Sequence, residues 1–236
     1  MQRYEILWPG GLVIRDIQAI GGPIAEPLKI GTFGEIRTPM ATITRLDQLD
    51  PNKQYTYADY LTWQFSDRVE LLWGYIRQMA APNQRHQQLA SDLHGNIWTY
   101  LRGRPCRVYL APFDVRLPRK HKLTNEDIIT VIQPDLCIIC DLSKIDKAGC
   151  LGAPDWIIEI LSKGNTKKEM KEKFDAYEES GVREYWIVQP AYSNILVYTL
   201  QNEKFQAAPT LFSTDQNATS HCFPDLTIDL NEVFAD

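Results

Sequence analysis

The chain has 236 residues and a formal net charge of -5. With 44% apolar, 23% charged and 11% aromatic residues, its composition is that of a globular protein and excludes a disordered or fibrous chain. The acidic balance counts mildly against a nucleic-acid binder, but a local basic patch suffices for binding, so that class stays open.

Residues 1–53 are interrupted repeatedly by glycine and proline, so we expect a loop-rich N-terminal extension there. A single domain is expected over residues 54–236. Met40 is a second candidate start, in which case the first 39 residues would be an upstream extension.

Capping residues and periodicity predict the first elements of the domain. Thr56 can cap a short helix that reaches about residue 65, and residues 68–79 indicate two short strands around a turn. A longer helix is expected from Asn83 to about Leu101, because leucine or isoleucine recurs there every four residues.

Three strands are predicted next, over residues 106–117, 131–140 and 155–161, and the last two are near-continuous apolar runs typical of central strands. A helix over residues 166–180 should end at Gly181.

The C-terminal part completes the predicted sheet. Residues 184–190 and 194–200 indicate a β-hairpin, and residues 226–234 a strand followed by a helical turn. Together the elements predict an α/β (α+β) domain with a mixed β-sheet flanked by helices.

The five cysteines are an odd number, and Cys137 and Cys140 fall within an apolar strand. We therefore expect a reduced cytoplasmic protein with buried thiols. A zinc site at this pair is rejected, because strand residues three apart point to opposite faces and no second such pair supplies the missing ligands. The sequence contains no run of 18 apolar residues, so no transmembrane helix is expected. The N-terminus lacks the features of a signal peptide.

Two carboxylates stand out because they lie in strands that are otherwise apolar. Asp135 follows Pro134 at the start of one strand, and Glu159 has isoleucine on both sides. A buried carboxylate is costly unless it is paired or bound to a cation, so two on adjacent strands suggest a shared metal ion. The alternative is that each pairs with a nearby lysine or arginine, or lies at an exposed strand end.

The helix after Glu159 places a lysine near these acids. Its core-facing stripe is predicted as Met170, Phe174 and Tyr177, and Lys173 lies roughly 60° from the centre of that stripe. Periodicity alone favours a lysine that lies along the helix rim with its charge in water.

The chain resembles the Uma-two family of restriction endonucleases, within the PD-(D/E)XK nuclease superfamily. The resemblance covers about residues 54–235 and rests on segments in a fixed order: YTYADYL, VELLWGYI, RHQQL, APFDVRL, QPDL, GAPDWIIEILS, a K-x-x-x-Y pair, GVREYWIVQP and FPDLTIDLNEVF. It implies a restriction-endonuclease-like fold.

The resemblance also implies a metal-dependent nuclease centre. Asp135 and Glu159 would hold Mg²⁺, or Mn²⁺ in its place, with the backbone carbonyl of Ile160 as a further ligand. Lys173 would stand in for the usual lysine two residues after the glutamate, where this chain has Leu161. Glu70 and His86 would line the same cleft. For His86, a purely structural role on the helix surface is an equally good interpretation.

The leading hypothesis is Mg²⁺-dependent hydrolysis of DNA phosphodiester bonds, and the alternative is an inactive nuclease-fold protein that acts in nucleic-acid binding or assembly. Basic side chains could contact phosphate, and aromatic residues such as Trp8, Trp63 and Trp73 could serve a homodimer, although core packing explains them equally well. The candidate phosphate contacts are Arg85, Arg116, Arg119, Lys120, Lys122, Lys163, Lys167 and Lys168.

Overall fold

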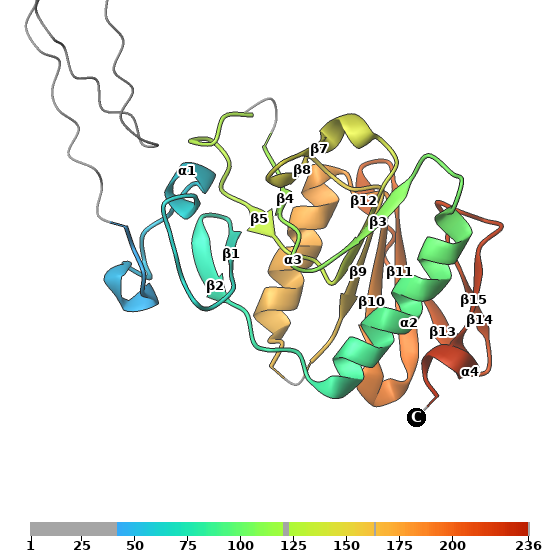
Figure 1. Ribbon diagram of the computed structural model, residues 1–236. Helices are drawn as coiled ribbons and strands as arrows, with labels where there is room; N and C mark the ends of the chain where they lie inside the picture. The colour runs from blue at the N-terminus through green and yellow to red at the C-terminus, as the bar shows by residue number, and fades with distance from the viewer. Residues whose placement is uncertain (1–41, 120–122, 163, 236) are drawn as a thin grey trace, which may run out of the picture. The chain divides into compact units, whose positions relative to one another are not determined.

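The computed structural model describes residues 42–119, 123–162 and 164–235 (Figure 1). Most of the predicted N-terminal extension, with Met40 and Trp8, lies outside these residues. The described part of the extension holds a 3-10 turn at Leu46–Gln48 and one bridge between Ile43 and Trp63. The predicted boundary at residue 54 stays a prediction.

Each of the longer helices begins where the sequence offers a capping side chain. Asn83 accepts a hydrogen bond from the amide of His86 at the start of α2, and Thr166 accepts one from Glu169 at the start of α3. Gly181 ends α3 in the left-handed conformation (φ 86°). The helices are α1 Tyr57–Tyr60, α2 Gln84–Leu101, α3 Lys167–Ser180 and α4 Leu230–Val233.

Helix α1 is shorter than predicted. Thr56 caps it as expected, but the helix ends at Tyr60. The chain then turns so that Trp63 pairs with Ile43 and packs edge-on against Tyr55, at 5.4 Å between ring centroids. Tertiary packing of one aromatic ring thus overrides the local helical pattern.

The main sheet has seven strands, with β9 parallel to β10 and all other pairs antiparallel. Its order is β12-β11-β10-β9-β6-β3, and β13 also pairs with β11. The bounds are β3 Arg107–Leu110, β6 Leu136–Ile139, β9 Trp156–Ile160, β10 Glu184–Gln189, β11 Asn194–Gln201, β12 Lys204–Phe205 and β13 Thr210–Ser213.

A six-stranded sheet has the order β2-β1-β5-β4-β8-β7, and two further strands, β14 and β15, pair with each other. The bounds are β1 Val69–Leu72, β2 Tyr75–Gln78, β4 Val115–Arg116, β5 Val131–Ile132, β7 Ile145–Asp146, β8 Gly149–Leu151, β14 Asn217–Thr219 and β15 Thr227–Asp229.

Two predicted long strands are each divided between the sheets. The predicted strand 106–117 becomes β3 in the main sheet and β4 in the six-stranded sheet, and 131–140 becomes β5 and β6 in the same way. Pro112 and Pro134 lie at the two crossings. Because proline has no amide hydrogen to donate, a strand ladder readily ends beside it. Strands β4, β5 and β6 are buried, whereas β3 at the sheet edge is exposed or half-buried.

Helices α2 and α3 cover opposite faces of the main sheet (Figure 1). Ile158 and Ile160 of β9 pack into the cluster that includes α2, whereas Ile157 packs with Ala176 and Tyr177 of α3. Because strand side chains alternate between faces, Glu159 falls on the α3 side. The predicted mixed α/β fold, the hairpin β10–β11 and the C-terminal strand and turn are confirmed.

The expectation that all five cysteines are free thiols is wrong for two of them. Cys106 and Cys140 form a disulfide, while Cys137 and Cys150 are buried free thiols. Antiparallel pairing of β3 with β6 brings the start of β3 next to the end of β6, so Cys106 meets Cys140 although the two residues are 34 positions apart. The sequence did not predict this pair because the two cysteines are far apart along the chain.

Within the described residues no helix is long and apolar enough to cross a membrane. The cytoplasmic location stays a prediction.

Candidate active site

Glu159 is held by two side chains from α3. The amino group of Lys173 lies 3.0 Å from Oε1 of Glu159, and the Tyr177 hydroxyl donates to the same oxygen at 2.5 Å. The two donors are four residues apart, so they share one face of the helix. Lys173 and Tyr177 both donate to Oε1 of Glu159, so the other carboxylate oxygen, Oε2, is the one that a further ligand would use.

Lys173 is buried, with 7% of its surface exposed, and does not lie along the helix rim in water. The buried residues of α3 are Lys173, Ala176 and Tyr177, whereas Met170 is only half-buried. The inward face is therefore rotated from the predicted stripe toward the lysine. Periodicity missed this because it counts a lysine as polar regardless of the acids that it meets.

Glu70 reaches the same lysine from the other sheet. It lies in β1, is 2% exposed, and one of its oxygens is 3.2 Å from the Lys173 amino group. The backbone amide of Gln133 donates to Glu70 at 2.8 Å. Lys173 therefore bridges two carboxylates that belong to different sheets.

Asp135 immediately precedes β6 and is anchored by the neighbouring strand. Its Oδ2 accepts the Ile160 amide hydrogen at 2.7 Å and lies 3.1 Å from Nε2 of His86, on the first turns of α2. The second ring nitrogen of His86, Nδ1, is buried and has no hydrogen-bond partner among the described residues. The structure thus brings the predicted residues into two hydrogen-bonded groups, one around Lys173 and one around Asp135.

The electrostatics of these groups are dominated by burial and by the clustering of acids. Burial raises the pKa of Glu159 to about 7, with the charges of Asp135 and Glu70 adding to the increase and Lys173 opposing it. Burial by itself would lower the pKa of Lys173, but the charges of Glu159 and Glu70 outweigh it and raise the pKa. The hydrogen bond to Asp135 raises the pKa of His86. Asp135 and Glu70 thus both act on the proton affinity of Glu159.

A hard cation fits this set of donors. The oxygens of Asp135 and Glu159 are of the kind that Mg²⁺ prefers. Burial raises the pKa of Glu159 and the neighbouring charges of Asp135 and Glu70 add to that increase, so a cation at this place would favour the ionised carboxylate. No three histidine, cysteine, aspartate or glutamate side chains in the described residues are grouped to hold a metal by themselves.

Several supporting residues were not predicted. Gln133 is surrounded by hydrogen bonds: its side-chain oxygen accepts from Arg68 at 2.9 and 3.0 Å, and its amide donates to Asp114 at 2.8 Å and to Tyr60 at 3.3 Å. This network fixes the backbone amide that binds Glu70. Glutamine before the Pro-Asp pair was part of a recognised motif, but its partners come from distant segments that no local pattern connects.

Glu184 is a third carboxylate in an apolar strand, and it has a structural role. It is fully buried and accepts hydrogen bonds from Trp186 at 2.6 Å, Ser220 at 2.8 Å and the Cys222 amide at 2.7 Å. The burial argument applied equally to this residue, which sequence reasoning passed over. What separates it from Glu159 is that its partners are neutral donors.

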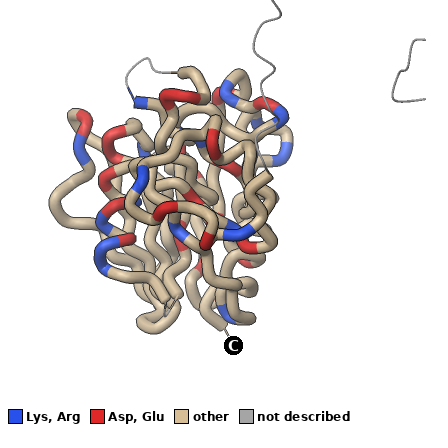
Figure 2. Tube along the Cα trace, turned by 90° about the vertical axis from the view of Figure 1, so that its left-hand side faces the viewer, with Lys and Arg blue, Asp and Glu red and all other residues tan. Residues whose placement is uncertain are grey.

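Several of the proposed phosphate contacts are used within the protein. Arg116 is 4% exposed and pairs with Asp146 at 2.6 Å, so its assignment as a phosphate contact is wrong. Arg85 donates to the carbonyls of Phe234 and Ala235, both at 2.6 Å. Figure 2 shows basic and acidic positions interspersed rather than one basic face. Lys120, Lys122 and Lys163 lie outside the described residues.

Of the aromatic residues proposed for a dimer interface, Trp63 and Trp73 pack against the protein's own core, and Trp8 lies outside the described residues. Trp63 and Trp73 contact two separate buried clusters, and Trp73 also lies under the Arg119 guanidinium at 4.5 Å. Trp73 has a left-handed backbone (φ 57°), which a non-glycine residue adopts at a small cost that this packing offsets. The homodimer stays a prediction.

Comparisons with known proteins identify a family and a related fold. The Uma2 family model, described as "Putative restriction endonuclease", matches residues 57–231. A crystal structure from Anabaena variabilis, described as a "putative nuclease belonging to DUF820", superposes with a TM-score of 0.60 and 19% sequence identity, covering 76% of this chain and 97% of that one. No curated protein matches. The structural match shows a shared fold.

Proposed function

Because the chain belongs to the Uma2 family of restriction endonucleases, we propose that it is a Mg²⁺-dependent endonuclease that hydrolyses DNA phosphodiester bonds. Family membership and the nuclease fold support a nuclease function. The observation that carries the finer proposal is the meeting of Glu159, Glu70 and Lys173 in one buried group beside Asp135.

In this proposal Asp135 and Glu159 hold the metal ion, and the carbonyl of Ile160 is a further candidate ligand. When bound, Mg²⁺ supplies a water of lowered pKa and polarises the phosphate. Lys173 offers a fixed positive charge next to the reacting phosphate, where negative charge develops. Tyr177 and Glu70 hold Glu159 and Lys173 in place.

His86 is proposed as a phosphate contact. The hydrogen bond to Asp135 raises its pKa and so favours the positively charged ring, whose charge attracts a phosphate group. A histidine of this kind can also return a proton to the leaving oxygen.

The direct test is cleavage of plasmid and oligonucleotide DNA by the purified chain with Mg²⁺ or Mn²⁺. Asp135→Asn should reduce the rate at least a hundredfold, whereas Asp141→Asn, a matched change at a fully solvated aspartate in a surface turn, should leave it unchanged. Wild-type rates for Asp135→Asn would overturn the proposed centre.

Calorimetric titration with Mg²⁺ or Mn²⁺ separates the active centre from an inactive nuclease fold. Because Glu159 is partly protonated near pH 7, metal binding should release protons, and the measured heat should depend on the ionisation enthalpy of the buffer. Asp135→Asn should abolish the binding heat. Absence of binding at millimolar metal in the wild type would favour the non-catalytic interpretation.

A further inference from the structure

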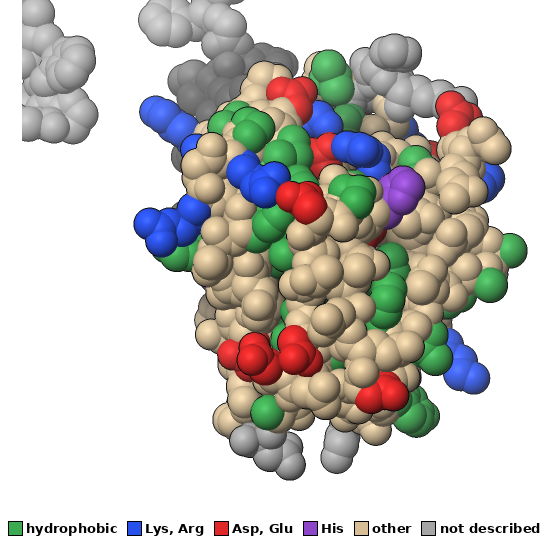
Figure 3. Space-filling view, turned by 90° about the vertical axis from the view of Figure 1, so that its right-hand side faces the viewer, with side chains coloured by type: hydrophobic (Ala, Val, Ile, Leu, Met, Phe, Trp, Pro, Cys, Tyr) green, Lys and Arg blue, Asp and Glu red, His purple; other side chains and the backbone are tan. Residues whose placement is uncertain are grey.

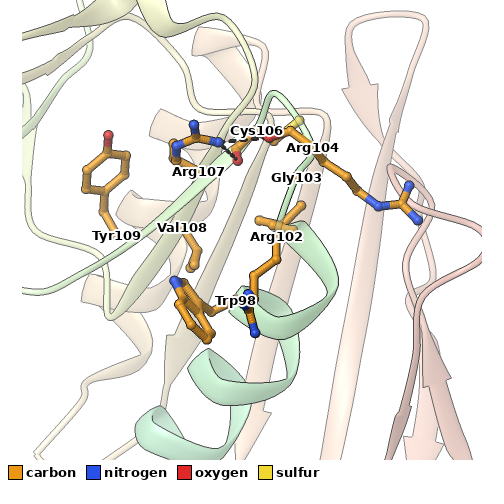
Figure 4. Close-up of a pocket in the computed structure, with 9 residues that line it drawn as sticks. Trp98, Arg102, Gly103, Arg104, Cys106, Arg107, Val108 and Tyr109 are labelled. Carbon is orange, nitrogen blue, oxygen red and sulfur yellow. Dashed lines mark hydrogen bonds between the residues drawn. The ribbon is translucent and has the colours of Figure 1, made fainter.

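An open pocket lies between the end of α2 and the edge strand β3 (Figure 4). It encloses about 360 Å³, which is within the usual range for small-ligand sites. Leu101, Val108 and the disulfide cysteine Cys106 form its apolar part. None of the described residues that line it is acidic, although the chain as a whole carries a charge of -5.

Two arginines and a tryptophan give the pocket its chemistry. Trp98 is 51% exposed, unusual for so large an apolar ring, and the guanidinium of Arg102 lies 5.2 Å from its centroid. Arg107 donates to the carbonyls of Arg104 and Cys106, which hold its guanidinium in place. Within the described part of the chain neither Arg102 nor Arg107 forms an ion pair, so both charges are available to an anion.

Arg104 differs from these two, although it also borders the pocket. Its side chain points away from the other sticks in Figure 4 and pairs with Asp225 at 3.0 Å. Figure 3 shows basic side chains in the upper part of this face, with acidic side chains among them. An exposed ring with the Arg102 guanidinium over it, in a pocket that Arg107 also lines, suits a planar base joined to a phosphate.

The pocket is connected to the acidic site by the open edge of the sheet. Strand β3 ends at Leu110, and the next amide, that of Ala111, donates to the backbone carbonyl of Asp135. From Arg107 to Leu110 the strand rises roughly 10 Å, and from His86 to Trp98 helix α2 rises roughly 18 Å. At about 3.4 Å per nucleotide, the pocket is three to five nucleotides from the acids.

We infer that this pocket binds one unpaired nucleotide of the substrate strand, its base stacked on Trp98 and its phosphate held by Arg102 and Arg107. An unpaired base is required because a base inside a duplex cannot offer its face to the ring. The inference rests on the proposed function for the identity of the ligand as nucleic acid. It adds that the substrate carries a single-stranded flank.

The test measures binding of fluorescent oligonucleotides to the Asp135→Asn protein, which keeps the strand intact, without added metal. A single strand of eight nucleotides spans both sites and one of three does not. Trp98→Ala or Arg102→Ala should weaken binding of the longer strand about tenfold, whereas Trp98→Phe should retain most of the affinity.

Lys204→Ala is the matched control, because it removes an exposed positive charge at β12, the opposite edge of the same sheet. Thermal melting should show that each variant remains folded, since Trp98 is half exposed. Equal losses in Lys204→Ala and Arg102→Ala, or unchanged affinity in Trp98→Ala, would overturn the pocket assignment. So would a blunt duplex that binds as tightly as one with an overhang.

The outcomes for the two proposals are distinguishable. If the wild type cleaves DNA but the pocket variants bind and cleave the longer strand normally, the nuclease proposal stands and the pocket assignment fails. If nothing is cleaved but the longer strand binds in a manner that depends on Trp98, the pocket assignment stands without the catalysis. If no strand binds to the wild type, the pocket assignment is wrong.

Discussion

Replacing Lys173 with methionine removes the positive charge that contacts both Glu159 and Glu70, and leaves a side chain of similar length. Both acids are buried, with 9% and 2% of their surfaces exposed. Removing one partner of a buried ion pair typically costs about 3–5 kcal/mol, because the remaining charge is uncompensated. The loss should depend strongly on pH.

The pH window follows from the pKa of Glu159. It is raised from 4.5 to about 7, so between these values the native state holds a proton that the unfolded chain has released, and stability falls as pH rises. This difference between the unfolded and folded pKa of Glu159 corresponds to a loss of roughly 3 kcal/mol of folding stability across the window. Lys173 lowers this pKa, so without it the pKa of Glu159 rises further and ionisation becomes more costly. Lys173→Met should therefore lose about 3–5 kcal/mol at pH 8 and roughly 1–2 kcal/mol at pH 5.

Urea unfolding at pH 5 and pH 8, without metal, measures both values. Lys171→Met is the matched control, because that lysine lies on the same helix, is 71% exposed and pairs with Asp175 on the surface. It should change stability by less than about 0.5 kcal/mol at either pH. Equal destabilisation of Lys173→Met at the two pH values, or less than about 1 kcal/mol at pH 8, would refute the assignment of Lys173 as counter-charge to Glu159.

Three further outcomes are expected. Tyr177→Phe removes the hydroxyl that donates to Glu159, so it should destabilise the protein by about 1–2 kcal/mol in urea unfolding and move the pH–rate profile to higher pH. Gly149→Ala should cost more than about 3 kcal/mol and lower the melting temperature, because an added Cβ would lie 2.2 Å from the Asp114 carbonyl at a φ of +122°. Thiol titration of the denatured, unreduced protein should find three free thiols rather than five.

The sequence alone determined the local elements and the identity of the acids. Capping by Asn83 and Thr166, the stop at Gly181 and the hairpin β10–β11 follow from interactions within a few residues, which a local pattern contains. Glu159 stood out because an acid between isoleucines must be compensated.

Tertiary structure decided which compensation each acid receives. Glu184 and Glu159 are both buried acids in strands, yet one meets an indole, a hydroxyl and an amide, and the other meets Lys173 and the Tyr177 hydroxyl. The difference arises from segments 36 to 38 residues away in one case and from the next helix in the other. No pattern within a strand contains that information.

The strand assignments failed for a related reason. Residues 106–117 and 131–140 were each predicted as one strand, but each crosses from one sheet to the other near a proline. Which sheet a segment joins depends on its partner strands, and a local apolar pattern does not contain those partners. The pairing of β3 with β6 brings Cys106 to Cys140 at one end of the ladder and ends β3 beside Asp135 at the other.

The sequence predicted that Asp135 and Glu159 are buried carboxylates that require a partner. Only the folded chain decided that Lys173 is buried against Glu159, that Tyr177 and Gln133 support the acids, and that Trp98 and Arg102 lie at the far end of an open edge. Hydrophobic periodicity records which side chains avoid water. It does not record which charges meet, because that depends on contacts between strands and helices distant in the sequence.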